Sequence, residues 1–260
     1  MEVIIRPEAE TAAELVAWLM ADFVREQPGA TLGLATGRTM EKVYDRLVSM
    51  KLDFSQCSTF NLDEYIGLPP DHRNSYRSYM DDRLFDHINI DKGNTHLPDG
   101  MSADYRAEAA RYEKLIQAAG GIDLQLLGIG RSGHIGFNEP LSALFSRTRE
   151  KGLTQATIDQ NAPLFDDPDE MPRRAFTMGI GTILDARRII LLATGAEKAE
   201  ILAKAVEGPV TAMISATALQ LHPSTTVIVD EKAASDLKGV EYYRWLFENE
   251  PEWEKYREPS

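Results

Sequence analysis

The stretch GIGRSGHIGFNEP, residues 128–140, is rich in glycine and holds two side chains suited to proton transfer, His134 and Glu139. Glycines let a backbone approach a bound molecule closely, and a carboxylate beside an imidazole favours the protonated ring and fixes which nitrogen carries the proton. Such a pair can act as a general acid or base near neutral pH. For this histidine taken alone, the alternative is a ring that only satisfies a loop carbonyl.

Two further loops carry groups that complement this pair. ATGRT, residues 35–39, precedes a predicted helix whose free amides favour an anion, and Arg38 adds guanidinium donors for phosphate oxygens. NLDEYIGLPP, residues 61–70, places Asp63 directly after a predicted strand, where a carboxylate can act as a general base. Capping is the structural alternative, by Thr39 for the helix and by Asp63 for a turn. Together, the three loops favour catalysis on a phosphorylated small molecule.

These loops follow strands in a chain that alternates extended and helical patterns. Strands are predicted at residues 2–6, 31–36, 57–62, 122–130, 188–194 and 225–230, and helices at residues 7–29, 40–51, 75–85 and 103–119. This alternation predicts a doubly wound, mostly parallel α/β sheet with helices on both faces, a Rossmann-like architecture. Ligands bind beyond the carboxyl ends of such strands, so the three loops lie where a site is expected.

The chain is expected to form a single domain over residues 1–260, because no repeat, low-complexity tract or Ser/Gly linker divides it. Residues 155–174, which include FDDPDEMPRR, show little periodicity and several prolines, and we predict a long loop or lid there. The acidic C-terminal stretch FENEPEWEKYREPS, residues 247–260, is predicted to be a solvated tail or edge.

Composition argues against several classes of partner. The net charge of −13, from 28 Lys+Arg and 41 Asp+Glu, repels nucleic acid and anionic membrane surfaces. The longest aliphatic run, IILLATGA, is far shorter than the roughly 20 residues of a membrane span, and no secretory signal pattern is present at the N-terminus. A cytoplasmic protein without nucleic-acid or membrane partners is therefore expected. The lone Cys57 is predicted to be buried, and the scattered histidines predict no metal site.

Four motifs, TFNLDEYIGLP, GIGRSGHIGFNEP, SRTR and LQLHP, resemble in order those of the glucosamine-6-phosphate deaminase family. The resemblance runs over nearly the whole chain. The related 6-phosphogluconolactonases share the fold but carry a GHTASLFP-like sequence where this chain has GHIGFNEP. The resemblance implies conversion of a phosphorylated amino sugar, glucosamine 6-phosphate, to fructose 6-phosphate and ammonia, without a metal or organic cofactor.

The resemblance also implies roles for individual residues. Asp63 matches the base that moves a proton between C2 and C1 of the sugar, and His134, held by Glu139, matches the group that assists ring opening. The residues that match the family's phosphate-binding positions are Thr36, Gly37, Arg38, Thr39 and Lys198. Lys198 is predicted near the start of a helix, which suits an anion site.

The chain departs from the family pattern at two positions in the site. Ser132 stands where the family often has Asp, so one acidic partner of the histidine is absent, although a serine hydroxyl can still orient the ring. Pro163 stands where many members place a phosphate-binding arginine on the lid. Arg38, where the family commonly has glycine, is expected to supply that charge from the opposite side.

A second site is implied by hexameric members that are activated by N-acetylglucosamine 6-phosphate. The residues at the matching positions are Tyr112, Ser142, Arg149, Lys151 and Tyr242, while Arg188 stands where an acid is found. We therefore expect a homo-oligomer, with a hexamer as one form, and an activator site. A solvated face is the alternative interpretation of Arg149 and Lys151.

Other functions remain open at this stage. A galactosamine-6-phosphate deaminase or another phosphosugar isomerase would keep the chemistry and change the sugar. A 6-phosphogluconolactonase and a non-catalytic sugar-phosphate sensor are the further alternatives. The sensor is less favoured, because Asp63, His134 and Glu139 are all present and no DNA-binding helix pair precedes residues 1–7.

Overall fold

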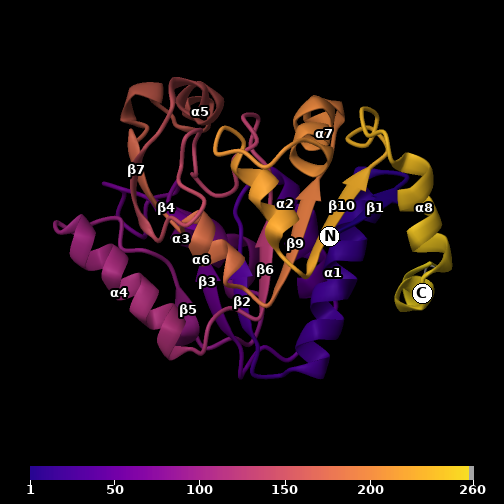
Figure 1. The fold of residues 1–260 in the computed structure, drawn as a ribbon. Coiled ribbons are helices and arrows are strands. Elements are labelled where there is room, and N and C mark those ends of the chain that lie inside the picture. The colour runs from indigo at the N-terminus through magenta and orange to yellow at the C-terminus, as the bar shows by residue number, and fades with distance from the viewer. Residues whose placement is uncertain (258–260) are drawn as a thin grey trace.

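The computed structural model describes residues 1–257, which form two β-sheets with helices around them (Figure 1). The larger sheet has seven strands in the order β1-β10-β9-β6-β2-β3-β5, and every neighbouring pair is parallel. Its strands are β1 (Glu2–Arg6), β2 (Thr31–Leu34), β3 (Ser58–Asn61), β5 (Thr95–His96), β6 (Leu124–Leu127), β9 (Arg188–Ala193) and β10 (Thr225–Asp230). The predicted doubly wound α/β fold is confirmed.

Helices cover both faces of this sheet. The α-helices are α1 (Ala9–Glu26), α2 (Arg38–Ser49), α3 (Tyr76–Met80), α4 (Tyr105–Ala118), α5 (Gln155–Asn161), α6 (Ile180–Leu184), α7 (Ala199–Glu207) and α8 (Val240–Asn249). Helices α1 and α2 pack together, while α6 and α7 both pack against the 3-10 segment Ser215–Leu221 (Figure 1). Right-handed crossovers place α2 and α7 on opposite faces, because the chain runs outward from β2 to β3 but in the other direction from β9 to β10.

This reversal of direction creates a switch point between β2 and β6. The chain leaves β2 toward β3 and β5, returns to β6, and then continues to β9 and β10. Loops that follow β2 and β6 therefore diverge and leave a crevice at the carboxyl ends of the two strands, which is where such sheets bind ligands.

A second, smaller sheet was not predicted from the sequence. It consists of three antiparallel strands in the order β4-β8-β7, with β4 (Asp63–Tyr65), β7 (Arg149–Gly152) and β8 (Arg174–Thr177). Thr177 of β8 pairs with Asp63 on one side and with Arg149 on the other. The small sheet thus carries the predicted general base on one of its outer strands.

The segment predicted as a long loop or lid, residues 155–174, connects β7 to β8. It is more regular than predicted, because it contains helix α5 and two 3-10 turns, Ala162–Leu164 and Pro168–Glu170. It packs on a small apolar cluster separate from the main core. The members of this cluster are Tyr65, Leu68, Phe137, Ile158, Phe165, Met171 and Ala175.

The C-terminal stretch, predicted as a solvated tail or edge, is an edge whose acids are mostly exposed and whose aromatic side chains anchor it, rather than a free tail. Residues Pro251–Tyr256 form a 3-10 helix, and the aromatic rings of Phe247, Trp253 and Tyr256 are buried in the main core. Three aromatic residues in ten positions offer more apolar area than the surrounding acids can keep in water. Residues 258–260 lie outside the described part of the chain. The prediction that Cys57 is buried is confirmed.

Candidate active site

Four neighbouring strand ends bring the predicted catalytic and phosphate-binding residues to one edge of the large sheet. Strands β9, β6, β2 and β3 are adjacent in that order. The chain after β9 carries Lys198, the loop after β6 carries His134, the loop after β2 is residues 35–37, and Asp63 follows β3. Parallel strands end at the same edge, so residues scattered from 36 to 198 in sequence meet there.

Glycine at position 130 makes room for the His134 ring. The backbone amide of Gly130 donates to the carbonyl of His134 at 2.9 Å, which folds the loop back on itself. A Cβ added at Gly130 would lie 2.1 Å from His134 Nε2 and 2.4 Å from Cδ2. The imidazole therefore rests directly over the glycine backbone, in space that any other residue would fill with its own side chain.

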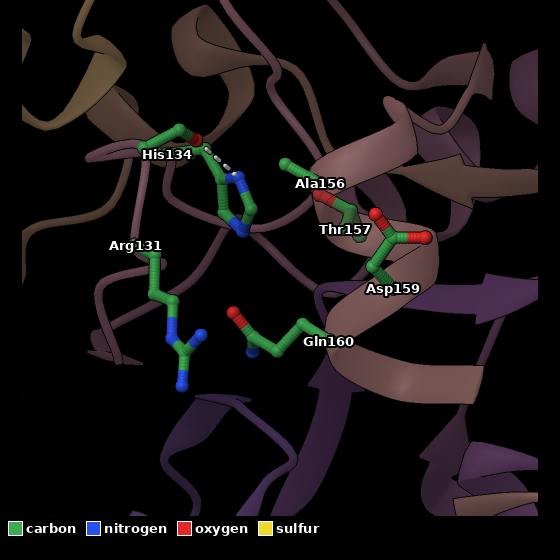
Figure 2. A pocket seen from close by; sticks show the side chains of 7 residues that line it. Arg131, His134, Ala156, Thr157, Asp159 and Gln160 are labelled. Carbon is green, nitrogen blue, oxygen red and sulfur yellow. Dashed lines mark hydrogen bonds between the residues drawn. The ribbon is translucent and has the colours of Figure 1, made fainter. Parts of the chain in front are cut away.

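His134 is held at ring nitrogen Nδ1, whereas Nε2 has no hydrogen-bond partner among residues 1–257. Nδ1 lies 2.9 Å from Ser132 Oγ and 3.1 Å from Glu139 Oε2. An ionised carboxylate can only accept, so Nδ1 carries the proton and Nε2 of the neutral ring is an acceptor. Nε2 points into the pocket between Arg131 and Gln160 (Figure 2). This is the tautomer that a general base needs.

Glu139 remains ionised in spite of its burial, with a side chain only 2% exposed. Burial alone would raise the pKa of this carboxyl, but hydrogen bonds from His134 and Thr157 outweigh that effect and lower the pKa to about 2. Its second oxygen, Oε1, accepts from the hydroxyl of Thr154 at 3.0 Å and from the hydroxyl of Thr157. The carboxylate thus joins the glycine-rich loop to the first turn of α5.

Asp63 is a buried carboxyl, 6% exposed, on strand β4. Burial and the neighbouring charge of Glu64 raise the pKa of Asp63 to about 8. Its Oδ2 lies 3.5 Å from the place where a Cβ of Gly136 would stand, so it faces the loop that carries His134. Glu64 has a structural use, because its carboxylate accepts the backbone amides of Tyr76 and Arg77 at 3.0 Å each. Of the two acids, Asp63 is the one available for proton transfer.

The predicted phosphate-binding loop has the backbone that an anion site needs. Gly37 adopts a φ of 113°, a left-handed conformation that favours glycine, and helix α2 begins at the next residue, Arg38. The first amides of α2 have no partner within the helix and point at the turn. Thr39 lies inside the helix, so the alternative that it caps the helix does not hold.

Lys198 approaches the same edge from the other side. It is the last residue of the 3-10 turn Ala196–Lys198, one residue before α7 begins, rather than the first residue of a helix. Its Nζ donates to the carbonyl of Ile129 at 2.8 Å, which brings the ammonium group to the glycine-rich loop. Burial lowers the pKa of Lys198, and the nearby charge of Arg131 acts in the same direction.

A cavity of about 290 Å³ lies between the glycine-rich loop and α5. Arg131, Ser132 and His134 line it from the loop, and Ala156, Thr157, Asp159 and Gln160 line it from α5 (Figure 2). Prediction from sequence did not assign roles to Arg131 and Gln160, whose side chains face each other across this cavity. Arg131 lies within the motif GIGRSGHIGFNEP, whereas Gln160 lies in a segment without a periodic signal.

The five residues predicted for an activator site do not all come together within one chain. Arg149 donates to Ser142 Oγ at 3.1 Å, and Lys151 lies two residues along the same strand. Tyr112 is completely buried, and its hydroxyl lies 2.7 Å from the carbonyl oxygen of Asn61. Tyr242 is on α8, which packs against β1 on the opposite side of the molecule from β7 (Figure 1). Only Ser142, Arg149 and Lys151 form a local group.

Within residues 1–257, no group of three or more His, Cys, Asp or Glu side chains is placed to hold a metal ion. Across the same residues, none of the helices combines the length and apolar character required to cross a membrane.

Comparison with known proteins places this architecture in a family. Residues 7–229 match the family model of glucosamine-6-phosphate isomerases/6-phosphogluconolactonase. A protein from Hahella chejuensis (strain KCTC 2396) named glucosamine-6-phosphate deaminase is 53% identical over 250 residues, which cover 95% of each chain. A solved structure described as a monomeric glucosamine-6-phosphate deaminase superposes with a TM-score of 0.89 at 44% identity, covering 91% of this chain and 100% of the other.

A 6-phosphogluconolactonase structure from Thermotoga maritima shares the fold, with a TM-score of 0.73 over 88% of this chain and 99% of the other. It is 20% identical, and that likeness shows the fold alone. The resemblance stated on the four sequence motifs is confirmed by the much higher identities above. This chain belongs to the family of glucosamine-6-phosphate isomerases and 6-phosphogluconolactonases.

Proposed function

We propose that this protein converts glucosamine 6-phosphate and water to fructose 6-phosphate and ammonia. The observation that carries the proposal is the pairing of two proton-transfer groups at one sheet edge. His134 presents an acceptor Nε2 to the cavity, and Asp63, which follows β3, two strands away from β6 in the sheet, is a buried carboxyl with a raised pKa. Identities of about half to proteins named glucosamine-6-phosphate deaminase support the same reaction.

Ring opening is the step assigned to His134. Its Nε2 accepts the proton of the C1 hydroxyl, the bond between C1 and the ring oxygen breaks, and the proton is returned to that oxygen. The ring must therefore be neutral at Nε2 when the sugar binds. Glu139 and Ser132 meet this need because both hold Nδ1, which leaves Nε2 facing the cavity.

Isomerisation is the step assigned to Asp63. Its carboxylate takes the proton from C2 of the open-chain sugar and delivers it to C1, while a proton of the amino group passes to the C1 oxygen, which leaves a C1 hydroxyl and a C=N bond at C2. Water then adds to C2 and ammonia departs, so that the carbonyl of fructose 6-phosphate forms. A carboxylate with a raised pKa is a stronger base than an ordinary one, which suits abstraction of a carbon-bound proton. Its conjugate acid is weak enough to hold that proton at neutral pH.

The phosphate group is assigned to the turn formed by Thr36, Gly37, Arg38 and Thr39 and to Lys198. The left-handed Gly37 and the start of α2 at Arg38 support this assignment. Arg131 lines the cavity and acts on the pKa of Lys198, so we assign it a share of the same anion. The positive charge that many family members place at the position of Pro163 is thus assigned to Arg131, in the loop after β6, as well as to Arg38, at the start of α2.

A coupled assay for ammonia and fructose 6-phosphate tests the proposal. Wild-type protein is expected to release both in equal amounts from glucosamine 6-phosphate, and Asp63→Asn is expected to release neither while still binding the sugar phosphate. Faster turnover of galactosamine 6-phosphate would favour the other epimer. Hydrolysis of 6-phosphogluconolactone without ammonia release would favour the lactonase reaction, and binding without turnover of any of these would favour a sensor.

A second anion site is proposed for Ser142, Arg149 and Lys151. The observation that favours it is the environment of Arg149, whose half-buried guanidinium donates to the neutral oxygens of Asn138 and Ser142 and has no carboxylate partner within residues 1–257. Burial without such a partner lowers the pKa of Arg149. An activator such as N-acetylglucosamine 6-phosphate would supply the missing negative charge. Sigmoidal kinetics that become hyperbolic with this compound would support the site, and unaffected hyperbolic kinetics would argue against it.

We also propose an oligomeric state and a cellular location for this protein. We propose a homo-oligomer, because Leu141 and Phe145, near this second anion site, are 76% and 86% exposed and would be covered by another copy. The solved relative described as monomeric favours the opposite outcome. Light scattering on the purified protein decides between a single-chain mass of 29.0 kDa and a multiple of it.

A cytoplasmic location is proposed because the one cysteine is buried without a disulfide partner.

A further inference from the structure

The carboxylate of Glu139 connects two segments that are separate in sequence. One oxygen, Oε2, lies 3.1 Å from His134 Nδ1. The other, Oε1, accepts from the hydroxyls of Thr154 and Thr157 and, at 3.4 Å, from the backbone amide of Thr154. Every close partner of Oε1 therefore belongs to the segment that covers the cavity.

The hydroxyl of Thr157 and the carboxylate of Glu139 are both buried, and it would cost free energy to leave either group without a hydrogen-bond partner. Thr157 is 6% exposed, and Glu139 is 2% exposed on the scale of its side chain. Within residues 1–257, His134 is the one basic side chain in ion-pair contact with Glu139. The negative charge consequently depends on the two threonine hydroxyls, since hydrogen bonds to charged groups are stronger than those between neutral groups.

Helix α5 is fixed in place by contacts on its other side. Ile158, the neighbour of Thr157, packs in the small apolar cluster with Phe137, which lies in the same loop as His134 and Glu139. At the end of α5, Asn161 donates to Tyr65 Oη at 3.0 Å. Docking of α5 onto this cluster is what brings the hydroxyl of Thr157 to the carboxylate.

We propose that Thr157, assisted by Thr154, is a positioning residue for the catalytic histidine. When α5 is docked, the two hydroxyls hold Oε1 of Glu139, so Oε2 stays on Nδ1 of the imidazole and Nε2 faces the cavity as an acceptor. Without these hydroxyls the carboxylate can rotate, and the ring loses its fixed orientation and tautomer. This inference rests on the proposed function, because it concerns the ring-opening step assigned to His134.

The chain offers a matched control for this contact. Thr182 on α6 is 2% exposed and donates to Glu113 Oε1 at 2.6 Å. It is likewise a buried threonine that donates to a glutamate, but it lies outside the candidate site. Thr157→Val and Thr182→Val thus remove the same kind of hydrogen bond with the same change of shape.

The first measurement is steady-state kinetics with glucosamine 6-phosphate. Thr157→Val is expected to lower kcat by about 10- to 100-fold with little change in KM, because it removes a hydrogen bond to a charged group that acts on the chemical step. Thr157→Ser, which keeps the hydroxyl, is expected to restore most of the activity. Thr182→Val is expected to match the wild type. Thr154→Ala, a change at the less buried partner, is expected to act in the same direction with a smaller loss.

The second measurement does not depend on turnover. Nitrogen NMR of the histidine rings, with the His134 signals assigned by their loss in His134→Gln, is expected to show one tautomer protonated at Nδ1 in the wild type and a mixture in Thr157→Val. If the wild type released no ammonia, the proposed function would fail while this spectrum still tested the contact. An unchanged spectrum in Thr157→Val, or a Thr157→Ser variant as impaired as Thr157→Val, would overturn the inference. If Thr157→Val does not fold, the Thr154→Ala and Thr157→Ser spectra decide it.

Discussion

Adding one methyl group at Gly130 should displace the imidazole of His134 without altering the fold. A Cβ at this position would lie 2.1 Å from His134 Nε2, and ordinary contact for a Cβ begins at 3.4 Å. The ring must therefore retreat by about 1.3 Å, the difference between these distances. The backbone of Gly130 is not in the left-handed region, so alanine fits its conformation.

The expected loss in kcat for Gly130→Ala is about 100-fold, because a displacement of about 1 Å at a reacting group costs that much. The assay is ammonia release from glucosamine 6-phosphate, with thermal unfolding measured in parallel. Gly128→Ala is the matched control in the same loop: its Cβ would meet only Met40 Cε, the flexible end of a side chain, at 3.3 Å. A folded Gly130→Ala variant with at least a third of wild-type kcat would refute the assignment of His134 to the chemical step.

Four further predictions concern charges in and around the site. Asp63 must be ionised to accept a proton, so kcat/KM of the wild type should rise as pH increases through about 8. Because the folded-state pKa of this acid lies above its unfolded value, the native state binds more protons and loses stability between about pH 4 and pH 8. The free energy of unfolding of Asp63→Asn relative to the wild type should therefore increase as pH rises through that window. In urea unfolding this gain should reach on the order of 4 kcal/mol at pH 7, and a pH-independent difference would contradict it. Ser132→Asp places a second carboxylate beside Nδ1 and favours the charged ring, so the acid limb of the pH–rate profile should move to higher pH; an unchanged profile would show that Ser132 does not influence the ring. Arg38→Gly and Arg131→Gln should each raise KM for the sugar phosphate about tenfold at low salt with little change in kcat, and a variant whose KM barely moves identifies a cation that does not contact the phosphate.

The residues that could be placed from sequence are those that follow buried strands of the large sheet. The loops after β2, β3 and β6 were expected to converge because parallel strands end at one edge, and His134 and Asp63 do lie at that edge. Strands are recognisable as short runs of apolar and β-branched residues, such as VII in β1, IILLA in β9 and VIV in β10.

The small sheet and its contacts could not be predicted for a physical reason. Its strands have the sequences DEY, REKG and RAFT, which are too short and too polar to show an alternating apolar pattern. Helix α5, with the sequence QATIDQN, has one large apolar side chain, Ile158, and no periodic signal. The contact between Thr157 and Glu139 depends on docking these weakly patterned pieces onto a shared cluster, and only the three-dimensional structure supplies that information.

The register of the small sheet has a consequence for how this protein can diverge. Thr177 pairs with both Asp63 and Arg149, so the base is fixed by a hydrogen-bonded row that lies outside the segment between β7 and β8. That segment can change in length or sequence while the row stays in register, as connections between antiparallel strands tolerate insertions. Natural variation should therefore reshape the roof of the cavity far faster than it moves the carboxyl group of Asp63.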